Sequence, residues 1–146
     1  MEVKFKALNV MSLNTRGIRD ITKRKALFLH CKHSNSDIIL LQETHSCESD
    51  MKFWKSQWGH SLYPSHGSNH SAGVMTLLHK FKGDVLENSA SLDGRWTLMV
   101  VKSDNSTFII GNIYGHNSYS LNRGLFDVIA KKGKAFRLNT QGLLPF

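Results

Sequence analysis

Acidic residues, cysteines and long apolar runs are scarce in this sequence, and each shortage excludes a class of protein. The two cysteines, Cys31 and Cys47, have no CxxC spacing, which argues against a disulfide-rich scaffold and predicts free thiols in a reducing compartment. No run of about 18 apolar residues occurs, so no membrane span is predicted. The N-terminal segment has no small-residue cleavage site, which argues against a signal peptide. We therefore expect an intracellular protein, nuclear or cytoplasmic, that has no membrane partner.

The shortage of acidic residues leaves a strong positive charge. The chain carries 19 Lys and Arg against 11 Asp and Glu, which gives a formal net charge of +8 and a pI near 9.7. An excess of this size on 146 residues suggests a polyanionic partner such as DNA, RNA or anionic lipid. A basic protein without such a partner is the equal alternative. With 40% hydrophobic and 21% charged residues, the composition is that of one globular domain with a sizeable core.

The first part of the chain has the pattern of a β-α-β unit. Residues 5–13 alternate as a strand, and Asp20 can cap a helix that runs to His33. Residues 37–42 follow as a second strand, whose apolar run is typical of a strand covered on both faces. This order favours an α/β fold class. The predicted inner face of the helix consists of Ala26, Leu27, Leu29 and His30.

The middle of the chain predicts a short helix and then a run of antiparallel strands. A third helix follows the strands, and from residue 130 the pattern loses its period and becomes basic. We therefore divide the chain into a partial domain, residues 1–130, and a divergent basic tail, residues 131–146. The predicted elements are a helix at 49–57, strands at 62–64, 72–78, 84–90, 96–102 and 107–114, and a helix at 119–129 with Leu121, Leu125, Phe126 and Ile129 on one face.

Three polar residues stand at the ends of predicted strands: Asn14, Glu43 and Tyr114. Strands that share a sheet face can bring such residues to one edge, where a rigid scaffold holds them. Mg²⁺ prefers oxygen ligands and usually takes only one or two carboxylates. An amide can orient the carboxylate, and a phenol can donate a hydrogen bond to the charge that develops on a phosphate. The three residues therefore form a sensible set around a metal-bound phosphate.

Four motifs appear in a fixed order along the chain. They are LNVMSLNTRG at 8–17, DIILLQETH at 37–45, SAGV at 71–74 and GNIY at 111–114. Each motif alone is weak, but the ordered set resembles the endonuclease/exonuclease/phosphatase superfamily. The set is most similar to the apurinic-like endonuclease domain of LINE-type non-LTR retrotransposons, related to exonuclease III and the apurinic/apyrimidinic endonucleases.

The resemblance implies a two-sheet, DNase I-like α/β sandwich that hydrolyses DNA phosphodiesters with Mg²⁺ or Mn²⁺. It implies Glu43 as the metal ligand, Asn14 beside it and Tyr114 at the scissile phosphate. The resemblance also implies a role in DNA repair or retrotransposition and a nuclear location. Asn117 follows the tyrosine where the family often has a polar residue, although Gly115 and His116 replace the usual Ala-Pro. Arg95, in a Gly-Arg-Trp pattern, is expected near a phosphate or in a structural role.

The chain departs from the family after the helix predicted at 119–129. The family's second half carries an Asp-x-Asn motif, a further aspartate and a closing Ser-Asp-His that activates water. No residue after Asp127 is acidic or His. We therefore expect the N-terminal portion of a sandwich, from a truncated or disrupted retroelement copy or an early gene end. As this fragment, the enzyme would be inactive or weak. The alternatives are a non-catalytic nucleic-acid-binding remnant and a structural fragment with no nucleic-acid role.

Each of these residues also has a plainer interpretation. Glu43 alone would be a solvated carboxylate at a strand end, Asn14 a turn residue and Tyr114 a surface aromatic. His45 is expected beside the metal site or at the surface. Basic residues near Asn14 could meet a DNA backbone or form a solvated face. These residues are Arg16, Arg19, Lys23 and Arg24. Packing is the expected role of Trp54, Trp58 and Trp96.

A sandwich that lacks part of its second sheet should be marginally stable. The expected bare residues on the inner face of the first sheet are Ile39, Leu41, Val74 and Ile113. At about 25 cal/mol per Å², a few hundred Å² of apolar surface left in water forfeits several kcal/mol, which is comparable to the stability of a small domain. We predict an aggregation-prone product that associates through exposed apolar sheet surface. A cooperative urea transition with a free energy of unfolding above about 8 kcal/mol would contradict this prediction.

Overall fold

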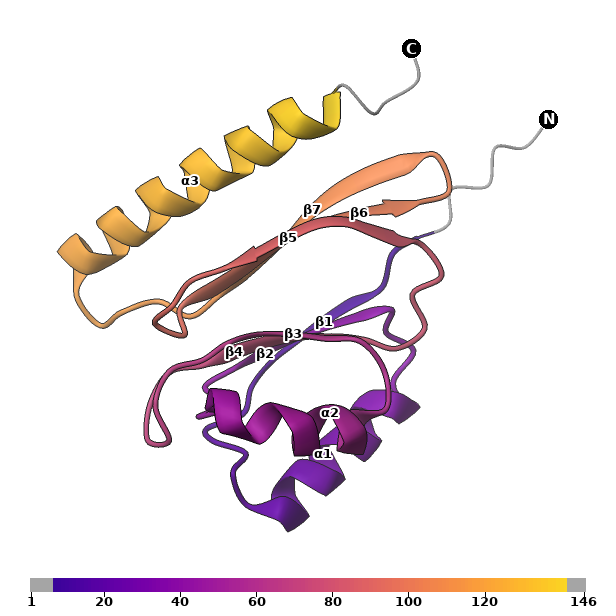
Figure 1. Cartoon of the computed structure of the whole chain (residues 1–146), viewed down its shortest axis with the longest axis vertical. Helices are drawn as coiled ribbons and strands as arrows, with labels where there is room; N and C mark the ends of the chain where they lie inside the picture. The colour runs from indigo at the N-terminus through magenta and orange to yellow at the C-terminus, as the bar shows by residue number, and fades with distance from the viewer. Residues whose placement is uncertain (1–6, 142–146) are drawn as a thin grey trace.

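Two β-sheets pack face to face in the computed structural model, which describes residues 7–141 (Figure 1). Two helices cover the outer face of the first sheet, and a long helix covers the outer face of the second (Figure 1). The predicted two-sheet α/β sandwich is confirmed.

In spatial order, the first sheet consists of β1 (Val10–Asn14), β2 (Ile38–Gln42), β4 (Val74–Leu78) and β3 (Leu62–Ser65). The second consists of β5 (Asp84–Ala90), β6 (Trp96–Ser103) and β7 (Ser106–Ile113). The helices are α1 (Ile21–His33), α2 (Met51–Trp58), which follows a 3-10 turn (Glu48–Asp50), and α3 (Tyr119–Gln141).

The predicted β-α-β opening is confirmed, because β1 and β2 are parallel neighbours joined by α1. All other strand pairs are antiparallel. Asp20 caps α1 by accepting a hydrogen bond from the Lys23 amide at 2.7 Å, and α1 ends at His33 as predicted. The first strand begins at Val10 rather than at residue 5, and residues 5 and 6 lie outside the described part.

The predicted inner face of α1 is wrong. The helix buries Arg24, Phe28 and Cys31, whereas Leu29 is exposed and Leu27 is half-buried. Ala26 and His30, also predicted inside, are exposed. The reason is Arg24, whose Nη1 donates to the carbonyl oxygens of residues 18 and 19 at 3.0 Å each and so turns this face inward. Apolar periodicity cannot predict a face that is centred on a buried arginine.

Helix α3 is longer than the sequence pattern predicts. It continues to Gln141 instead of ending near residue 129, so the first part of the expected tail is helical. Leu125 and Phe136 are buried against the outer face of the second sheet, with Ile129 packed beside them. Leu121 and Phe126, predicted on the same face, are exposed. Residues 142–146 lie outside the described part, and the proposed domain division stays a prediction.

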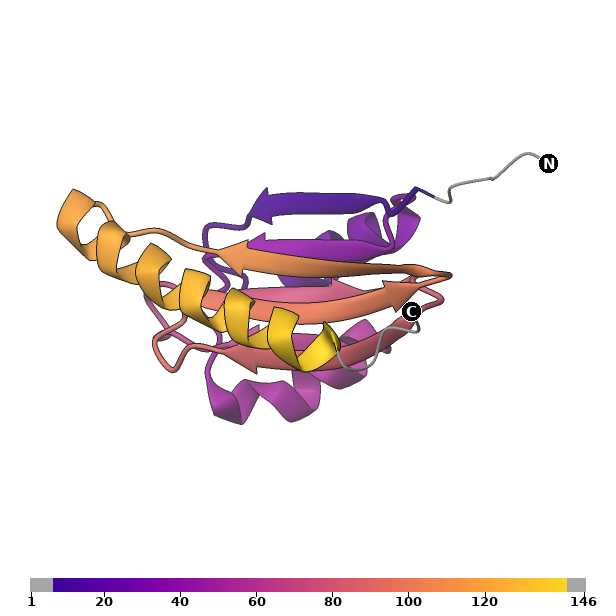
Figure 2. The same cartoon turned by 90° about the horizontal axis from the view of Figure 1, so that it is seen from above.

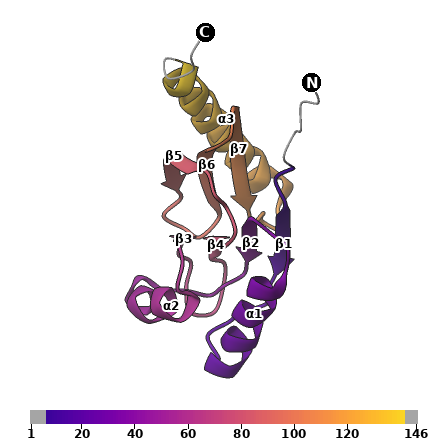
Figure 3. The ribbon, with the colours of Figure 1, turned by 90° about the vertical axis from the view of Figure 1, so that its right-hand side faces the viewer.

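The exposed apolar surface lies at different residues from those predicted. Ile39, Leu41 and Val74 are fully buried, because helices cover one face of the first sheet and the second sheet covers the other. Ile113 lies on β7 of the second sheet instead of the first, and it is half-buried against the cluster that contains Trp96 and Leu125. Exposed apolar side chains occur instead on the edge strands, at Val10 on β1 and Phe108 on β7. These two edges lie on the same flank of the molecule (Figure 3). Association through exposed apolar sheet surface stays a prediction. No helix in the described part of the chain combines the length and apolar character that a bilayer-spanning segment needs.

A buried asparagine ties the two sheets together. Asn112 on β7 is 1% exposed, and its Nδ2 donates to the carbonyl oxygens of Leu41 on β2 and Met75 on β4, at 3.2 and 3.1 Å. Its Oδ1 accepts a hydrogen bond from Gln42 Nε2 at 2.9 Å. A buried amide that bonds to groups on two strands of the other sheet fixes how β7 sits over β2 and β4.

We predict that Asn112→Ala lowers the free energy of unfolding by about 2 kcal/mol or more, because it removes the buried hydrogen bonds of Asn112 to the carbonyl oxygens of Leu41 and Met75 and to Gln42. The matched control is Thr107→Val on the same strand. Within the described part of the chain, the Thr107 hydroxyl is buried without a hydrogen-bond partner, so this isosteric change should be neutral or stabilising. Equal losses in the two variants, measured by urea denaturation, would contradict this role of Asn112.

Candidate functional site

The three predicted polar residues meet at one edge of the sandwich. Strands β1, β2 and β7 all run toward this edge, as their arrowheads show in Figure 2. Asn14 Nδ2 donates to Glu43 Oε1 at 3.1 Å, and the Tyr114 hydroxyl is hydrogen-bonded to the same carboxylate. Glu43 follows β2 of the first sheet and Tyr114 follows β7 of the second, so their contact crosses between the sheets. The sequence predicted that these residues could converge, and the roles assigned to them stay predictions.

Glu43 has a left-handed backbone conformation, with φ of +52°. Such a conformation is uncommon for a residue other than glycine and persists only where its surroundings impose it. Here the loop after β1 does so. The Gly17 amide donates to the Glu43 carbonyl oxygen at 2.6 Å, and the Thr15 hydroxyl lies 2.9 Å from the same oxygen. The carboxylate is therefore aimed by its backbone as well as by its side-chain partners.

The loop before β4 holds the other side of this segment. The Thr44 amide donates to the Gly73 carbonyl oxygen and the His45 amide to that of Ala72, each at 3.0 Å. Gly73 has φ of +91°, and a Cβ at this position would lie 2.5 Å from Thr44 Oγ1. This close approach explains in physical terms why a glycine stands in the motif at residues 71–74.

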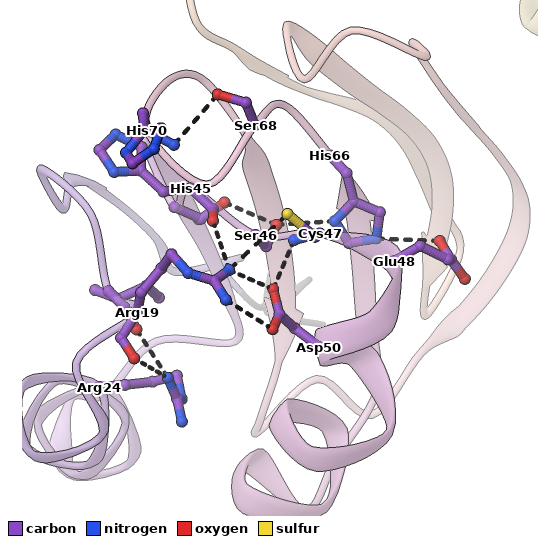
Figure 4. A network of polar contacts seen from close by, with 12 residues as sticks. Arg19, Arg24, His45, Ser46, Cys47, Glu48, Asp50, His66, Ser68 and His70 are labelled. Atoms are coloured by element: carbon purple, nitrogen blue, oxygen red, sulfur yellow. Dashed lines mark hydrogen bonds and ion pairs between the residues drawn. The ribbon is translucent and has the colours of Figure 1, made fainter.

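An ion pair closes the segment further along the chain (Figure 4). Arg19 Nη1 donates to the carbonyl oxygen of His45 at 3.1 Å and to Asp50 Oδ2 at 2.6 Å, and its Nη2 reaches Asp50 Oδ1 at 3.2 Å. Burial opposes ionisation of Asp50, but hydrogen bonds from Arg19 and the Cys47 amide outweigh it and lower the pKa of Asp50. The two-point guanidinium contact fixes the end of the loop.

A serine, a histidine and a glutamate line up nearby, but they do not form a catalytic triad. Ser46 Oγ lies 2.9 Å from His66 Nδ1, and His66 Nε2 lies 3.3 Å from the Glu48 carboxylate (Figure 4). Ser46 is fully buried and its hydroxyl also contacts Thr44 Oγ1, so no substrate can reach it. Burial lowers the pKa of His66, which favours a neutral ring. This chain of contacts supports the loop.

Most of the basic residues near Asn14 serve the fold. Arg24 is buried, Arg19 is paired with Asp50, and Lys23 Nζ donates to the Thr15 carbonyl oxygen at 2.8 Å. Of the four cations proposed for a DNA contact, Arg16 is the one whose side chain the structure leaves exposed without such an anchoring bond among the described residues.

The site holds a carboxylate and a phenol at neutral pH. Hydrogen bonds from Asn14 and then from Tyr114 lower the pKa of Glu43. Burial, followed by the hydrogen bond to Glu43, raises the pKa of Tyr114. The Arg95 guanidinium lies 5.0 Å from the centre of the Tyr114 ring, and its Nη1 donates to the Gly115 carbonyl oxygen at 2.9 Å. Arg95 thus borders the site. The sequence alone leaves the role of Arg95 open between a phosphate contact and a structural one.

The residues present fit part of a magnesium site. Among the described residues, no three His, Cys, Asp or Glu side chains are grouped to hold a metal ion together. One oriented carboxylate is nevertheless the protein contribution that Mg²⁺ often takes, with water and phosphate oxygens completing its shell. His45 is half-buried beside Glu43, and Asn117 is exposed in the loop after β7. No contact places Asn117 in the cluster, so its assigned role stays a prediction.

Known structures share this fold. TDP2 from Caenorhabditis elegans superposes with a TM-score of 0.64 over 90% of this chain and 43% of that chain, at 18% identity. The human Nocturnin catalytic domain, solved with a bound sulfate anion, gives 0.55 over 92% of this chain and 59% of that one, at 16% identity. The endonuclease domain of TRAS1, a telomere-specific non-LTR retrotransposon, gives 0.50 over 75% and 46%, at 11% identity. The chain thus spans about half the length of the structures it matches.

The fold is therefore the two-sheet, DNase I-like α/β sandwich that the ordered motifs predict. No family model matches the chain. Its sequence is 27% identical over 109 residues to an uncharacterised 149 kDa protein of transposon TX1 from Xenopus laevis, covering 74% of this chain and 8% of that protein. This relative agrees with the predicted likeness to retrotransposon endonucleases.

We predict that Tyr114→Phe raises the pKa of Glu43 toward its ordinary value, because it removes a hydrogen bond to the charged carboxylate. A lowered pKa in the folded state stabilises the protein above the unfolded pKa, about 4.3, and this contribution is lost as the pH falls through the folded value. The variant should therefore lose less stability on acidification than the wild type. Carboxyl ¹³C NMR measures the pKa. The control is Tyr119→Phe, at an 85% exposed residue, which should leave the pKa unchanged. An unchanged pKa of Glu43 in Tyr114→Phe would refute the coupling between the two side chains.

Proposed function

We propose that this chain supplies the metal-binding half of a metal-dependent DNA phosphodiesterase of the exonuclease III and apurinic/apyrimidinic endonuclease type. The observation that carries the proposal is the cluster of Asn14, Glu43 and Tyr114, joined by hydrogen bonds at one edge of a nuclease fold. The net charge of +8 is consistent with a polyanionic substrate. A DNA substrate makes the nucleus the proposed location.

In this proposal, Glu43 would hold Mg²⁺ or Mn²⁺, and Asn14 would keep its carboxylate in the binding orientation. The ion, when bound, would neutralise negative charge that develops on the phosphate. Tyr114 is protonated at neutral pH, so its hydroxyl can donate a hydrogen bond to a phosphate oxygen in place of the carboxylate. Arg95, beside the Tyr114 ring, adds a positive charge at the same edge.

Hydrolysis also needs a group that activates water. Among the described residues, no group of three Asp, Glu, His or Cys side chains stands together to supply both a metal ligand and such a base. We therefore propose that the isolated chain cleaves DNA slowly or not at all. The alternative function is non-catalytic binding of nucleic acid, which the basic charge favours.

We predict that Mn²⁺ broadens the NMR signals of residues 42–44 in the wild type and not in Glu43→Gln, because the amide removes the anionic ligand. Glu87→Gln, on edge strand β5 at the opposite flank, is the matched control and should broaden as the wild type does. Equal broadening in Glu43→Gln would exclude Glu43 as the ligand.

A parallel cleavage assay separates the two functions. Nicked and abasic duplex DNA are incubated with the protein, with Mg²⁺ or with EDTA. Cleavage that requires Mg²⁺ and is lost in Glu43→Gln supports the enzyme. Absent cleavage, together with DNA binding that weakens steeply with salt, supports the binding alternative. EDTA-resistant cleavage would overturn the metal-dependent mechanism.

A further inference from the structure

A groove of about 380 Å³ lies between α1 and α2, the two helices on the outer face of the first sheet (Figure 3). Four residues of α1 line it, Lys25, Phe28, Leu29 and Lys32, together with Gln57 of α2. Phe28 is buried and Leu29 is 54% exposed, so the groove has an apolar floor and an apolar rim. None of its lining residues belongs to the candidate site at the sheet edge.

The lining residues of α1 form one stripe along the helix. They stand at positions i, i+3, i+4 and i+7, which lie on the same helical face. Lys25 and Lys32 are therefore about 10.5 Å apart along the axis, with Phe28 and Leu29 between them. Apolar residues at this spacing are those that a helix presents to another helix. Since Leu29 is half-exposed, α2 leaves part of the stripe uncovered.

The charge around the groove has one sign. Together, α1 and α2 carry six Lys and Arg and no Asp or Glu. Acidic residues three or four positions away would otherwise pair with such lysines within a helix. No ion pair among the described residues involves Lys25 or Lys32. The positive charges at both ends of the apolar stripe are thus available to carboxylates of a partner.

Contacts between the two helices preform the groove. Arg24 Nε donates to Gln57 Oε1 at 2.6 Å, and Lys32 Nζ donates to the Gln57 carbonyl oxygen at 3.5 Å. The Phe28 ring packs edge-on against Trp58, with ring centres 5.4 Å apart. A surface held in this way loses little conformational freedom when a partner binds.

We propose that this groove binds an acidic amphipathic helix of another protein. Apolar side chains of that helix would pack on Phe28 and Leu29, and two carboxylates seven residues apart would pair with Lys25 and Lys32. A second copy of this chain does not fit, because its three described α-helices carry a single acidic residue, Asp127. Nucleic acid fits less well, because a phosphate backbone is bound by rows of cations, whereas an apolar pair separates the cations here. The inference does not depend on the proposed nuclease function.

The test measures the fluorescence anisotropy of a labelled helical peptide of about 16 residues, with Glu, Leu, Leu and Glu at i, i+3, i+4 and i+7. The groove variants are Leu29→Ser and Lys25→Glu. Ile21→Ser is the apolar control, because Ile21 lies on the same helix, is also 54% exposed and does not line the groove. Lys52→Glu, at an exposed lysine of α2 outside the groove, is the charge control. All four side chains are exposed, so the variants should fold. We expect each groove variant to bind about tenfold more weakly, and the controls to bind as the wild type does.

Two altered peptides test the two parts of the contact. With serine in place of both leucines, the peptide should bind the wild type about tenfold more weakly. With lysine in place of both glutamates, it should bind Lys25→Glu more tightly than it binds the wild type, because the charges are then exchanged.

Several results would overturn the proposal. One is a wild type that does not bind the acidic peptide, or that binds the serine peptide equally well. Another is an equal loss in Ile21→Ser or Lys52→Glu, since any exposed residue of that type would then serve. Duplex DNA and vesicles of phosphatidylserine and phosphatidylcholine are the competing probes. Binding of either that weakens in Lys25→Glu but not in Leu29→Ser, without binding of the acidic peptide, would assign this face to a phosphate-bearing partner instead.

Discussion

Backbone hydrogen bonds hold Glu43 from both sides, and the geometry of the site follows from this arrangement. The loop after β1 binds the carbonyl oxygen of Glu43, and the loop before β4 binds the amides of Thr44 and His45. A left-handed residue costs on the order of 1–3 kcal/mol, which a few buried hydrogen bonds can offset. Gly73 is required because a side chain there would collide with Thr44. The strain at Glu43 is therefore the local cost of turning one carboxylate toward β1 and β7.

The position of Tyr114 depends on the contact between the sheets. Stacked sheets lie about 10 Å apart, yet Tyr114 on one reaches Glu43 on the other. Asn112, two residues before Tyr114, bonds to Gln42, the residue before Glu43, and to carbonyl oxygens of β2 and β4. The buried amide thus sets the spacing directly beneath the two site residues. Replacement of Asn112 should accordingly lower the stability of the protein and alter the contact between Tyr114 and Glu43 together.

The sequence allowed prediction of what depends on strand order and strand ends. Ordered motifs located the β-α-β opening, the second sheet and the edge where Asn14, Glu43 and Tyr114 meet. It could not predict features that need the packed structure. Arg24 is an example, because its burial depends on carbonyl oxygens at a loop that folds back on the helix. Asn112 is another. It stands in the motif at residues 111–114, but its role appears only when β7 packs over β2 and β4. The length of α3 was missed because Phe136 finds its partner in the second sheet, far away in sequence.

The cations closest to the site show why net charge is a poor guide to nucleic-acid contact here. Arg19, Lys23 and Arg24 bind carboxylate and carbonyl oxygens of the protein, so they have few donors left for phosphates. Helix α3 begins at the site edge and runs back over the second sheet, which carries its later lysines away from the edge (Figure 1). Charge near the site is therefore limited, and Arg95 matters through its position on Tyr114. If DNA is the partner, affinity at this edge would depend on Tyr114, Arg95 and a metal ion that Glu43 would hold, more than on a broad basic surface.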